Sequence, residues 1–126
     1  MVLLDTDFIL NFFDQNQINH EITKALVEKY VDSQFAITNL VRQELATVLS
    51  VRIGYEFWSV VQAGIDEFEV INIFLDENDT RLIWGLFNSF KKKNISFIDC
   101  SNLYLAQKHG YKIASFDKFY PKEILI

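Results

Sequence analysis

The amino-acid sequence predicts an α/β fold in which helices cover both faces of a mainly parallel sheet, as in a three-layer α/β/α sandwich. Short apolar runs, of the length of buried strands, alternate with longer segments of helical spacing. This alternation implies right-handed crossovers between parallel strands, and such a sheet is buried on both faces. Half of the 126 residues are apolar and twelve are Phe, which favours a packed core over disorder.

A single domain spanning residues 1–126 is expected from the length of the chain. Pro occurs once and Gly four times, and no Ser-rich or Gly-rich linker interrupts the sequence. Nothing in the composition therefore marks an internal boundary or a repeat.

Five short apolar runs are suited to buried strands. They are Val2–Leu4, Phe35–Ile37, Phe68–Ile73, Ile113–Phe116 and Ile124–Ile126. In an open parallel sheet, ligands bind beyond the carboxyl ends of the strands. Polar residues that directly follow these runs are therefore the first candidates for a functional site.

Three segments between the apolar runs carry clear helical signals. They are Thr38–Val51, Asp79–Lys92 and Asp99–His109. Val41, Leu45 and Leu49 form an apolar stripe along the first segment, and Thr38 is suited to cap its N-terminus. Gly110 follows the last segment, as is favoured after a helix C-terminus.

The sequence is typical of a cytoplasmic protein. Its apolar stretches are interrupted by polar residues well before the roughly 18 residues of a membrane span, and Met1 is not followed by a secretory signal. Cys100 is the one cysteine, which excludes an intrachain disulfide and agrees with a reducing compartment.

The net charge of −5 argues against indiscriminate binding to nucleic acid, because phosphate neutralisation normally relies on clustered Lys and Arg. A contact with nucleic acid would have to be local. Part of the acidic excess could instead belong to a metal site, where bound cations would neutralise it.

Four acidic residues are expected at one edge of the sheet. Asp5 follows the run Val2–Leu4, and Asp117 follows Ile113–Phe116. Asp99 opens a helix, and Glu44 lies in the second turn of the helix that starts at the same edge. An Asp after an apolar run is by itself more often a turn or cap residue, so the combination carries the inference.

A cluster of carboxylates requires protons or cations. Two carboxylates about 5 Å apart repel by about 3 kcal/mol at an effective dielectric constant near 20. Oxygen ligands without Cys, and only two His, favour Mg²⁺ or Mn²⁺ over zinc. Such ions activate water and stabilise charge on a phosphate, so the cluster indicates metal-assisted phosphodiester hydrolysis.

Four segments resemble the signature regions of PIN domains, in order and at ordinary spacing. They are LLDTDFILNF, TNLVRQELATVL, ISFIDCSNLYLAQKHG and KIASFDKFY. The chain length most resembles stand-alone toxins of the VapC type. The resemblance implies a PIN-like fold, a Mg²⁺-dependent endoribonuclease activity on RNA, a homodimer, and neutralisation by a cognate antitoxin of the VapB type.

The resemblance also assigns site residues. The four acidic positions correspond to Asp5, Glu44, Asp99 and Asp117. Thr6 and Ser115 would support the first and the last of these acids through hydrogen bonds. Asp7 stands where the family usually has Asn, which makes it a further candidate for the metal shell. Lys118-Phe119 replaces an accessory acid that often follows the fourth carboxylate.

Two other functions fit parts of the pattern. Asp5-Thr6-Asp7 after a first strand also resembles the motif of haloacid-dehalogenase-type phosphatases, with Asp5 as nucleophile and Thr38 after the second strand. That interpretation assigns no role in the reaction to Glu44. A PIN-like module retained only for protein binding is the non-enzymatic alternative, and the complete set of four acids argues against it.

Basic and aromatic residues are given structural interpretations. The run Lys91-Lys92-Lys93 fits a solvated helix C-terminus, and Arg42 fits an exposed ion pair as well as a phosphate contact. Trp58 and Trp84 fit a core or a partner interface.

Overall fold

The computed structural model describes all 126 residues and has a four-stranded parallel sheet at its centre. The strands are β1 (Val2–Leu4), β2 (Phe35–Thr38), β3 (Ile71–Ile73) and β4 (Lys112–Ala114), in the spatial order β3-β2-β1-β4. The helices are α1 (Thr6–Phe13), α2 (His20–Lys29), α3 (Asn39–Arg52), α4 (Tyr55–Glu67), α5 (Glu77–Phe90) and α6 (Phe97–His109). A short 3₁₀ helix, η1 (Lys122–Ile124), lies near the C-terminus.

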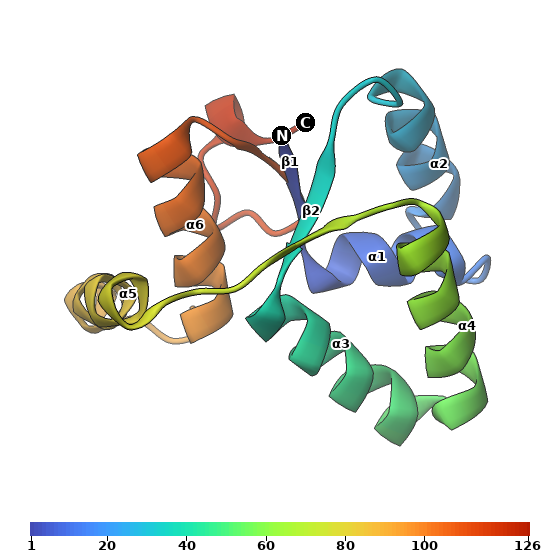
Figure 1. Ribbon diagram of the computed structural model, residues 1–126, viewed down its shortest axis with the longest axis horizontal. Helices are drawn as coiled ribbons and strands as arrows, with labels where there is room; N and C mark the ends of the chain where they lie inside the picture. Colours follow the sequence, from blue (N-terminus) through green and yellow to red (C-terminus); the bar gives the residue numbers. More distant parts are fainter.

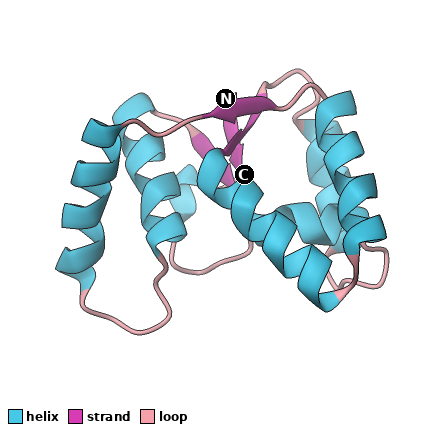
Figure 2. Cartoon of the chain, turned by 60° about the horizontal axis from the view of Figure 1, so that its bottom comes forward, coloured by secondary structure: helices cyan, strands magenta, loops and turns pink.

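The helices form two layers on opposite faces of the sheet, so the predicted three-layer α/β/α sandwich is confirmed. Figure 1 shows α5 and α6 on one side of β1 and β2, and α1, α2 and α4 on the other. In Figure 2 the strands lie between these two groups of helices. The right-handed crossovers that parallel strands require account for this placement.

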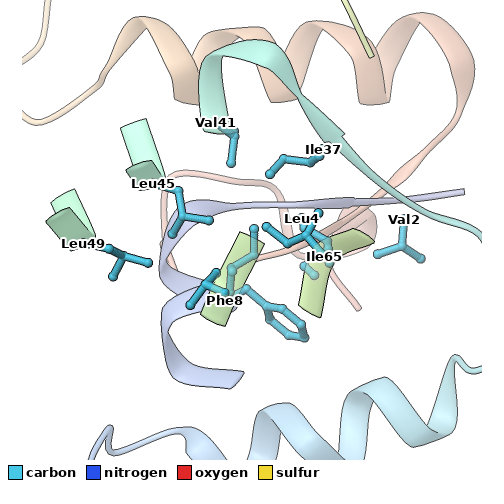
Figure 3. Packing of buried hydrophobic residues seen from close by; sticks show 11 residues of the cluster. Val2, Leu4, Phe8, Ile37, Val41, Leu45, Leu49 and Ile65 are labelled. Carbon is cyan, nitrogen blue, oxygen red and sulfur yellow. The ribbon is translucent and has the colours of Figure 1, made fainter. Parts of the chain in front are cut away.

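The alternation of side chains along the strands divides the core into two clusters. Val2 and Leu4 point towards α1, α3 and α4, whereas Leu3 points towards α6. Figure 3 shows the first cluster, in which the stripe of α3 predicted from the sequence meets the strands. Each fully buried Leu or Ile contributes roughly 1.5–3 kcal/mol to folding.

Two of the five predicted strands are wrong in extent and one is absent. The run Phe68–Ile73 forms a strand only from Ile71 onwards, because Phe68 caps the C-terminus of α4. The run Ile113–Phe116 ends as a strand at Ala114. The predicted strand Ile124–Ile126 is not formed, since only a single bridge from Ile113 to Leu125 places the C-terminus beside β4.

The predicted helices exist, with shifted starts. Thr38 caps α3 as expected, by accepting a hydrogen bond from the Val41 amide at 3.1 Å. α5 starts at Glu77, where Asp76 provides the cap. α6 starts at Phe97 with Ser96 as its cap, so the prediction that Asp99 opens this helix is wrong by two residues.

The N-termini of α1, α3 and α6 lie at the carboxyl edge of the sheet (Figure 1). α1 and α3 follow directly from β1 and β2, with one residue or none between strand and helix. Because these helices begin at the carboxyl edge, the polar residues at the ends of the strands lie there.

None of the six helices has the length and apolar character needed to cross a bilayer.

Candidate active site

Asp5 is the central acidic residue of the carboxyl edge. It follows β1 directly and caps α1, with Oδ1 accepting a hydrogen bond from the Thr6 amide at 2.9 Å. The residue is only 6% exposed. Its Oδ2 accepts from the Ser115 hydroxyl at 3.0 Å and from the Tyr120 hydroxyl at 3.2 Å. Asp5 is thus a buried carboxyl group held by neutral donors from three parts of the chain.

Asp7 joins α1 to the loop that follows β4. Its Oδ2 accepts a hydrogen bond from the Phe116 amide at 3.0 Å, and its Oδ1 lies 3.3 Å from the Ser115 hydroxyl. Ser115 therefore bridges Asp5 and Asp7. The same hydroxyl oxygen accepts a hydrogen bond from the Asp117 amide at 3.0 Å, which ties the loop of Asp117 to the first two acids.

Glu44 reaches the carboxyl edge from the second turn of α3. Its Oε2 accepts a hydrogen bond from the Thr6 hydroxyl. Thr6 does form the expected hydrogen bond to Asp5, through its backbone amide, while its hydroxyl donates to Glu44. Thr6 links two of the predicted acids by two different groups.

Asp99 lies in the first turn of α6 and forms a capping box with Ser96. The Ser96 amide donates to Asp99 Oδ2 at 2.9 Å, and the Asp99 amide donates to Ser96 Oγ at 3.0 Å. Asp117 forms a turn in which its Oδ1 accepts from the Phe119 amide at 2.9 Å. Both acids thus combine a local structural role with a place near the cluster.

The charges of the five acids act on one another. Burial, followed by the nearby charge of Asp7 and a smaller contribution from Asp99, raises the pKa of the Asp5 carboxyl to about 7. Burial is also the main cause that raises the pKa of Asp99, with the charges of Asp117 and Glu44 acting in the same direction. These couplings place the five carboxyl groups within electrostatic reach of one another.

Burial raises the pKa of Asp7 as well, and the charge of Asp117 adds to that effect. The hydrogen bonds from Phe116 and Ser115 oppose it by stabilising the ionised form. The site therefore holds several acids that would ionise more readily if a cation lay beside them.

The donor set fits a hard divalent cation. It consists of carboxylate oxygens, which are the ligand type that Mg²⁺ and Mn²⁺ prefer. Cys100 adjoins Asp99, but burial raises the pKa of its thiol and so disfavours the thiolate that would bind a metal. The chain has no group of three or more His, Cys, Asp or Glu side chains gathered closely enough to form a ready-made cage. Mg²⁺ commonly binds through one or two carboxylates and retains several waters, so such a cage is not a requirement.

Two buried residues behind Asp5 were not predicted from the sequence. They are Asn102, on α6, and Tyr120, in the segment after β4. Burial, followed by the charge of Asp5, raises the pKa of Tyr120 above its ordinary value, so its hydroxyl remains a proton donor. Asn102 lies three residues after Asp99 on the buried side of α6, and a polar residue in that position was the available signal.

The basic residues have the structural placements that were expected. Arg42 donates to Asn72 Oδ1 at 3.0 Å and lies 3.4 Å from Asp66 Oδ1. The run of lysines at 91–93 is exposed and follows the end of α5. The single cysteine, Cys100, is not basic but likewise has a structural placement, because it is buried in α6. None of these residues is among the donors to the five acids.

The profile of the PIN domain matches residues 2–122 of the chain. The chain belongs to the PIN domain family. This match covers all five acids of the carboxyl edge and both residues behind Asp5, so the site described above lies within the PIN domain. A search of curated protein sequences finds no match to the chain.

Solved structures share this PIN fold. VapC20 from Mycobacterium tuberculosis, described as a sarcin-ricin loop cleaving toxin, superposes with a TM-score of 0.83 at 17% sequence identity. That alignment covers 100% of this chain and 97% of VapC20. FitAcB from Neisseria gonorrhoeae superposes with a TM-score of 0.65 at 20% identity, over 93% of this chain and 88% of that one. Both likenesses concern the fold.

Proposed function

We propose that this PIN domain is a metal-dependent endoribonuclease that hydrolyses RNA phosphodiester bonds and leaves a 5′-phosphate. The observation that carries the proposal is the gathering of five carboxyl groups at the carboxyl edge of the sheet. They are Asp5, Asp7, Glu44, Asp99 and Asp117. Family membership favours a nuclease over the phosphatase interpretation of the same Asp5-Thr6-Asp7 segment.

The residues that would hold Mg²⁺ or Mn²⁺ are Asp5, Glu44, Asp99 and Asp117, with Asp7 as a further candidate for the metal shell. A bound divalent cation supplies positive charge that activates a water molecule and offsets the charge developing on the scissile phosphate. Asp5 is held by donors on both oxygens, so it offers a fixed position. The Thr6 hydroxyl orients Glu44 towards the same edge.

We further propose that the protein acts in the cytoplasm as the toxin of a toxin–antitoxin pair, and as a homodimer. The similarity of its fold to VapC20 supports the first part. The molar mass in solution, measured by light scattering, tests the homodimer. Co-purification with the product of an adjacent upstream reading frame tests whether the protein has a cognate antitoxin.

The decisive test of the activity compares the wild-type protein with Asp5→Asn. Wild-type protein with Mg²⁺ or Mn²⁺ is expected to cleave RNA, and chelation or Asp5→Asn is expected to abolish cleavage. Asp14→Asn is the matched control, because it removes the same charge at the far end of α1. The proposal fails if the metal-loaded wild-type protein leaves RNA intact. Release of phosphate from small phosphomonoesters without RNA cleavage would favour the phosphatase interpretation.

A further inference from the structure

Asn102 and Tyr120 form a buried polar pair directly behind Asp5. Asn102 is 0% exposed and Tyr120 is 2% exposed. The Asn102 side-chain amide lies 3.4 Å from Asp5 Oδ1 and 3.4 Å from the Tyr120 hydroxyl oxygen, while that hydroxyl donates to Asp5 Oδ2 at 3.2 Å. The three side chains come from α6, from the segment after β4 and from the end of β1.

The orientation of Asn102 leaves its own carbonyl oxygen without a partner. Asn102 Oδ1 is the one buried side-chain polar atom of the chain that has no hydrogen bond. Such an unpaired atom costs about 1–3 kcal/mol. The amide group nevertheless faces Asp5 and Tyr120, because both present acceptor oxygens. The orientation of Asn102 therefore leaves its carbonyl oxygen without a hydrogen bond and provides Asp5 with a further donor.

Tyr120 couples Asp5 to the loop of Asp117. The residue follows the turn closed by the hydrogen bond from Phe119 to Asp117, and its ring packs edge-on against Phe119 at 5.3 Å between centroids. Its hydroxyl group then reaches back to Asp5. A single side chain therefore relates the positions of two proposed ligands that lie 112 residues apart in the sequence.

With this pair in place, each Asp5 oxygen has two donors. Oδ1 faces the Thr6 amide and the Asn102 amide, and Oδ2 faces the Ser115 and Tyr120 hydroxyls. Thr6 and Ser115 adjoin the site itself, whereas Asn102 and Tyr120 approach from the buried side. Hydrogen bonds of this kind fix the orientation of ligating groups and typically change metal affinity by about 10- to 100-fold when removed.

We propose that Tyr120 and Asn102 are positioning residues that hold the Asp5 carboxylate in the orientation needed to bind a divalent cation. The inference rests on the proposed metal-dependent function, which it deepens by assigning two residues that touch neither substrate nor reacting atoms. A purely structural role would require only that the pair fill space and stabilise the fold. The affinity for a divalent cation therefore distinguishes the two roles. Loss of the Tyr120 hydroxyl would weaken cation binding in the positioning role, whereas a side chain that only fills space would leave cation binding unchanged.

The experiment measures Mn²⁺ binding by electron paramagnetic resonance, without any substrate. Tyr120→Phe keeps the ring and removes only the hydroxyl, and it is expected to weaken Mn²⁺ binding about 10-fold. Tyr104→Phe is the matched control, because the Tyr104 hydroxyl also donates to an aspartate, Asp79 Oδ1 at 2.8 Å, away from the site. This control is expected to bind Mn²⁺ as the wild-type protein does.

Asn102→Leu provides a second variant of similar volume, and it is also expected to weaken Mn²⁺ binding about 10-fold. Circular dichroism establishes whether each variant is folded. If only one of the two variants folds, the Mn²⁺ affinity of that variant tests the inference. Affinity within twofold of wild type in a folded variant would overturn the inference and leave the proposed function standing. Absence of Mn²⁺ binding in the wild-type protein would overturn both. Failure of both variants to fold would assign the pair to stability and overturn the positioning role.

Discussion

The Thr6 hydroxyl donates a hydrogen bond to Glu44 Oε2 across the gap between α1 and α3. Its backbone amide, at the same time, caps Asp5. Thr6 therefore holds both the preceding residue, Asp5, and Glu44, which lies 38 positions later in the sequence. The orientation of Glu44 depends on the Thr6 hydroxyl, whereas that of Asp5 depends in part on the Thr6 backbone amide.

Thr6→Val is expected to lower the rate of RNA cleavage about 10-fold, because the isosteric valine releases Glu44 and leaves the amide bond to Asp5 intact. Thr6→Ser, which restores a hydroxyl, is expected to recover most of the rate. Cleavage of a labelled RNA under single-turnover conditions measures both. Equal rates for Thr6→Val and wild type would show that this hydrogen bond does not contribute to the activity.

The layered arrangement of the sheet was predictable because the two central strands, β1 and β2, are apolar on both faces. Leu3 and Ala36 face one helical layer while Leu4 and Ile37 face the other, and only a sheet covered on both sides accommodates such runs. The same criterion failed for Ile124–Ile126. An apolar run indicates burial, but this segment is only half-buried beside β4, where a single bridge from Ile113 to Leu125 takes the place of a ladder of hydrogen bonds.

The helix α1 was not predicted individually because Asp5 alone separates it from β1, and the apolar character continues through Phe8 and Ile9. Periodicity cannot divide a run that short. Near Asp5, the sequence indicated Thr6 and Ser115 as hydrogen-bond partners of the acids, but it did not indicate Asn102 or Tyr120. The contact between Asp7 and the Phe116 amide spans 109 residues, and only tertiary structure establishes it.

Ser115→Ala is expected to destabilise the metal-free protein by about 1–3 kcal/mol. The hydroxyl donates to Asp5 and accepts from the Asp117 amide. Its removal leaves the half-buried Asp117 amide without this acceptor, and Asp5 Oδ2 with the Tyr120 hydroxyl as its donor. Ser101→Ala is the control, since Ser101 is equally a buried serine but bonds only to the Ile98 carbonyl of its own helix. Urea unfolding at neutral pH with chelator compares them, and an equal loss in both variants would contradict the bridging role of Ser115.

Gly64 marks a close approach of α4 to α1. A Cβ at this position would lie 2.5 Å from two ring atoms of Phe13, and that ring is itself held against Phe12. Gly64→Ala is therefore expected to cost about 1–3 kcal/mol, despite the helix propensity of Ala. Gly85→Ala in α5 is expected to stabilise by roughly 0.5–1 kcal/mol, because no atom lies within 4 Å of its Cβ.

Thermal and urea unfolding of the two glycine variants give the sign of each effect. Opposite signs support the close packing of α1 against α4. Stabilisation by both alanines would mean that Phe13 moves aside without cost, and the helices would then be more loosely packed than the contact implies.

The stability of the metal-free protein is expected to fall as the pH rises from about 4 to about 7. The Asp5 pKa is raised from 3.8 to about 7 on folding, so in this range the folded state binds more protons than the unfolded state. The raised pKa values of Asp7 and Asp99 act with the same sign. Ionisation of Asp5 above pH 7 thus costs stability, on the order of 2–4 kcal/mol, since each pKa unit corresponds to about 1.4 kcal/mol.

Asp5→Asn removes this ionisation while retaining a side-chain oxygen that can cap α1. The variant is therefore expected to be more stable than wild type at pH 8 and to show little advantage at pH 4, with chelator present in both cases. Urea unfolding across this pH range measures the difference. Addition of Mg²⁺ at pH 8 should raise the stability of wild type but not of Asp5→Asn, because only the wild-type cluster has the full charge to neutralise. A pH dependence that is identical in the two proteins would mean that Asp5 ionises as readily in the folded chain as in the unfolded one.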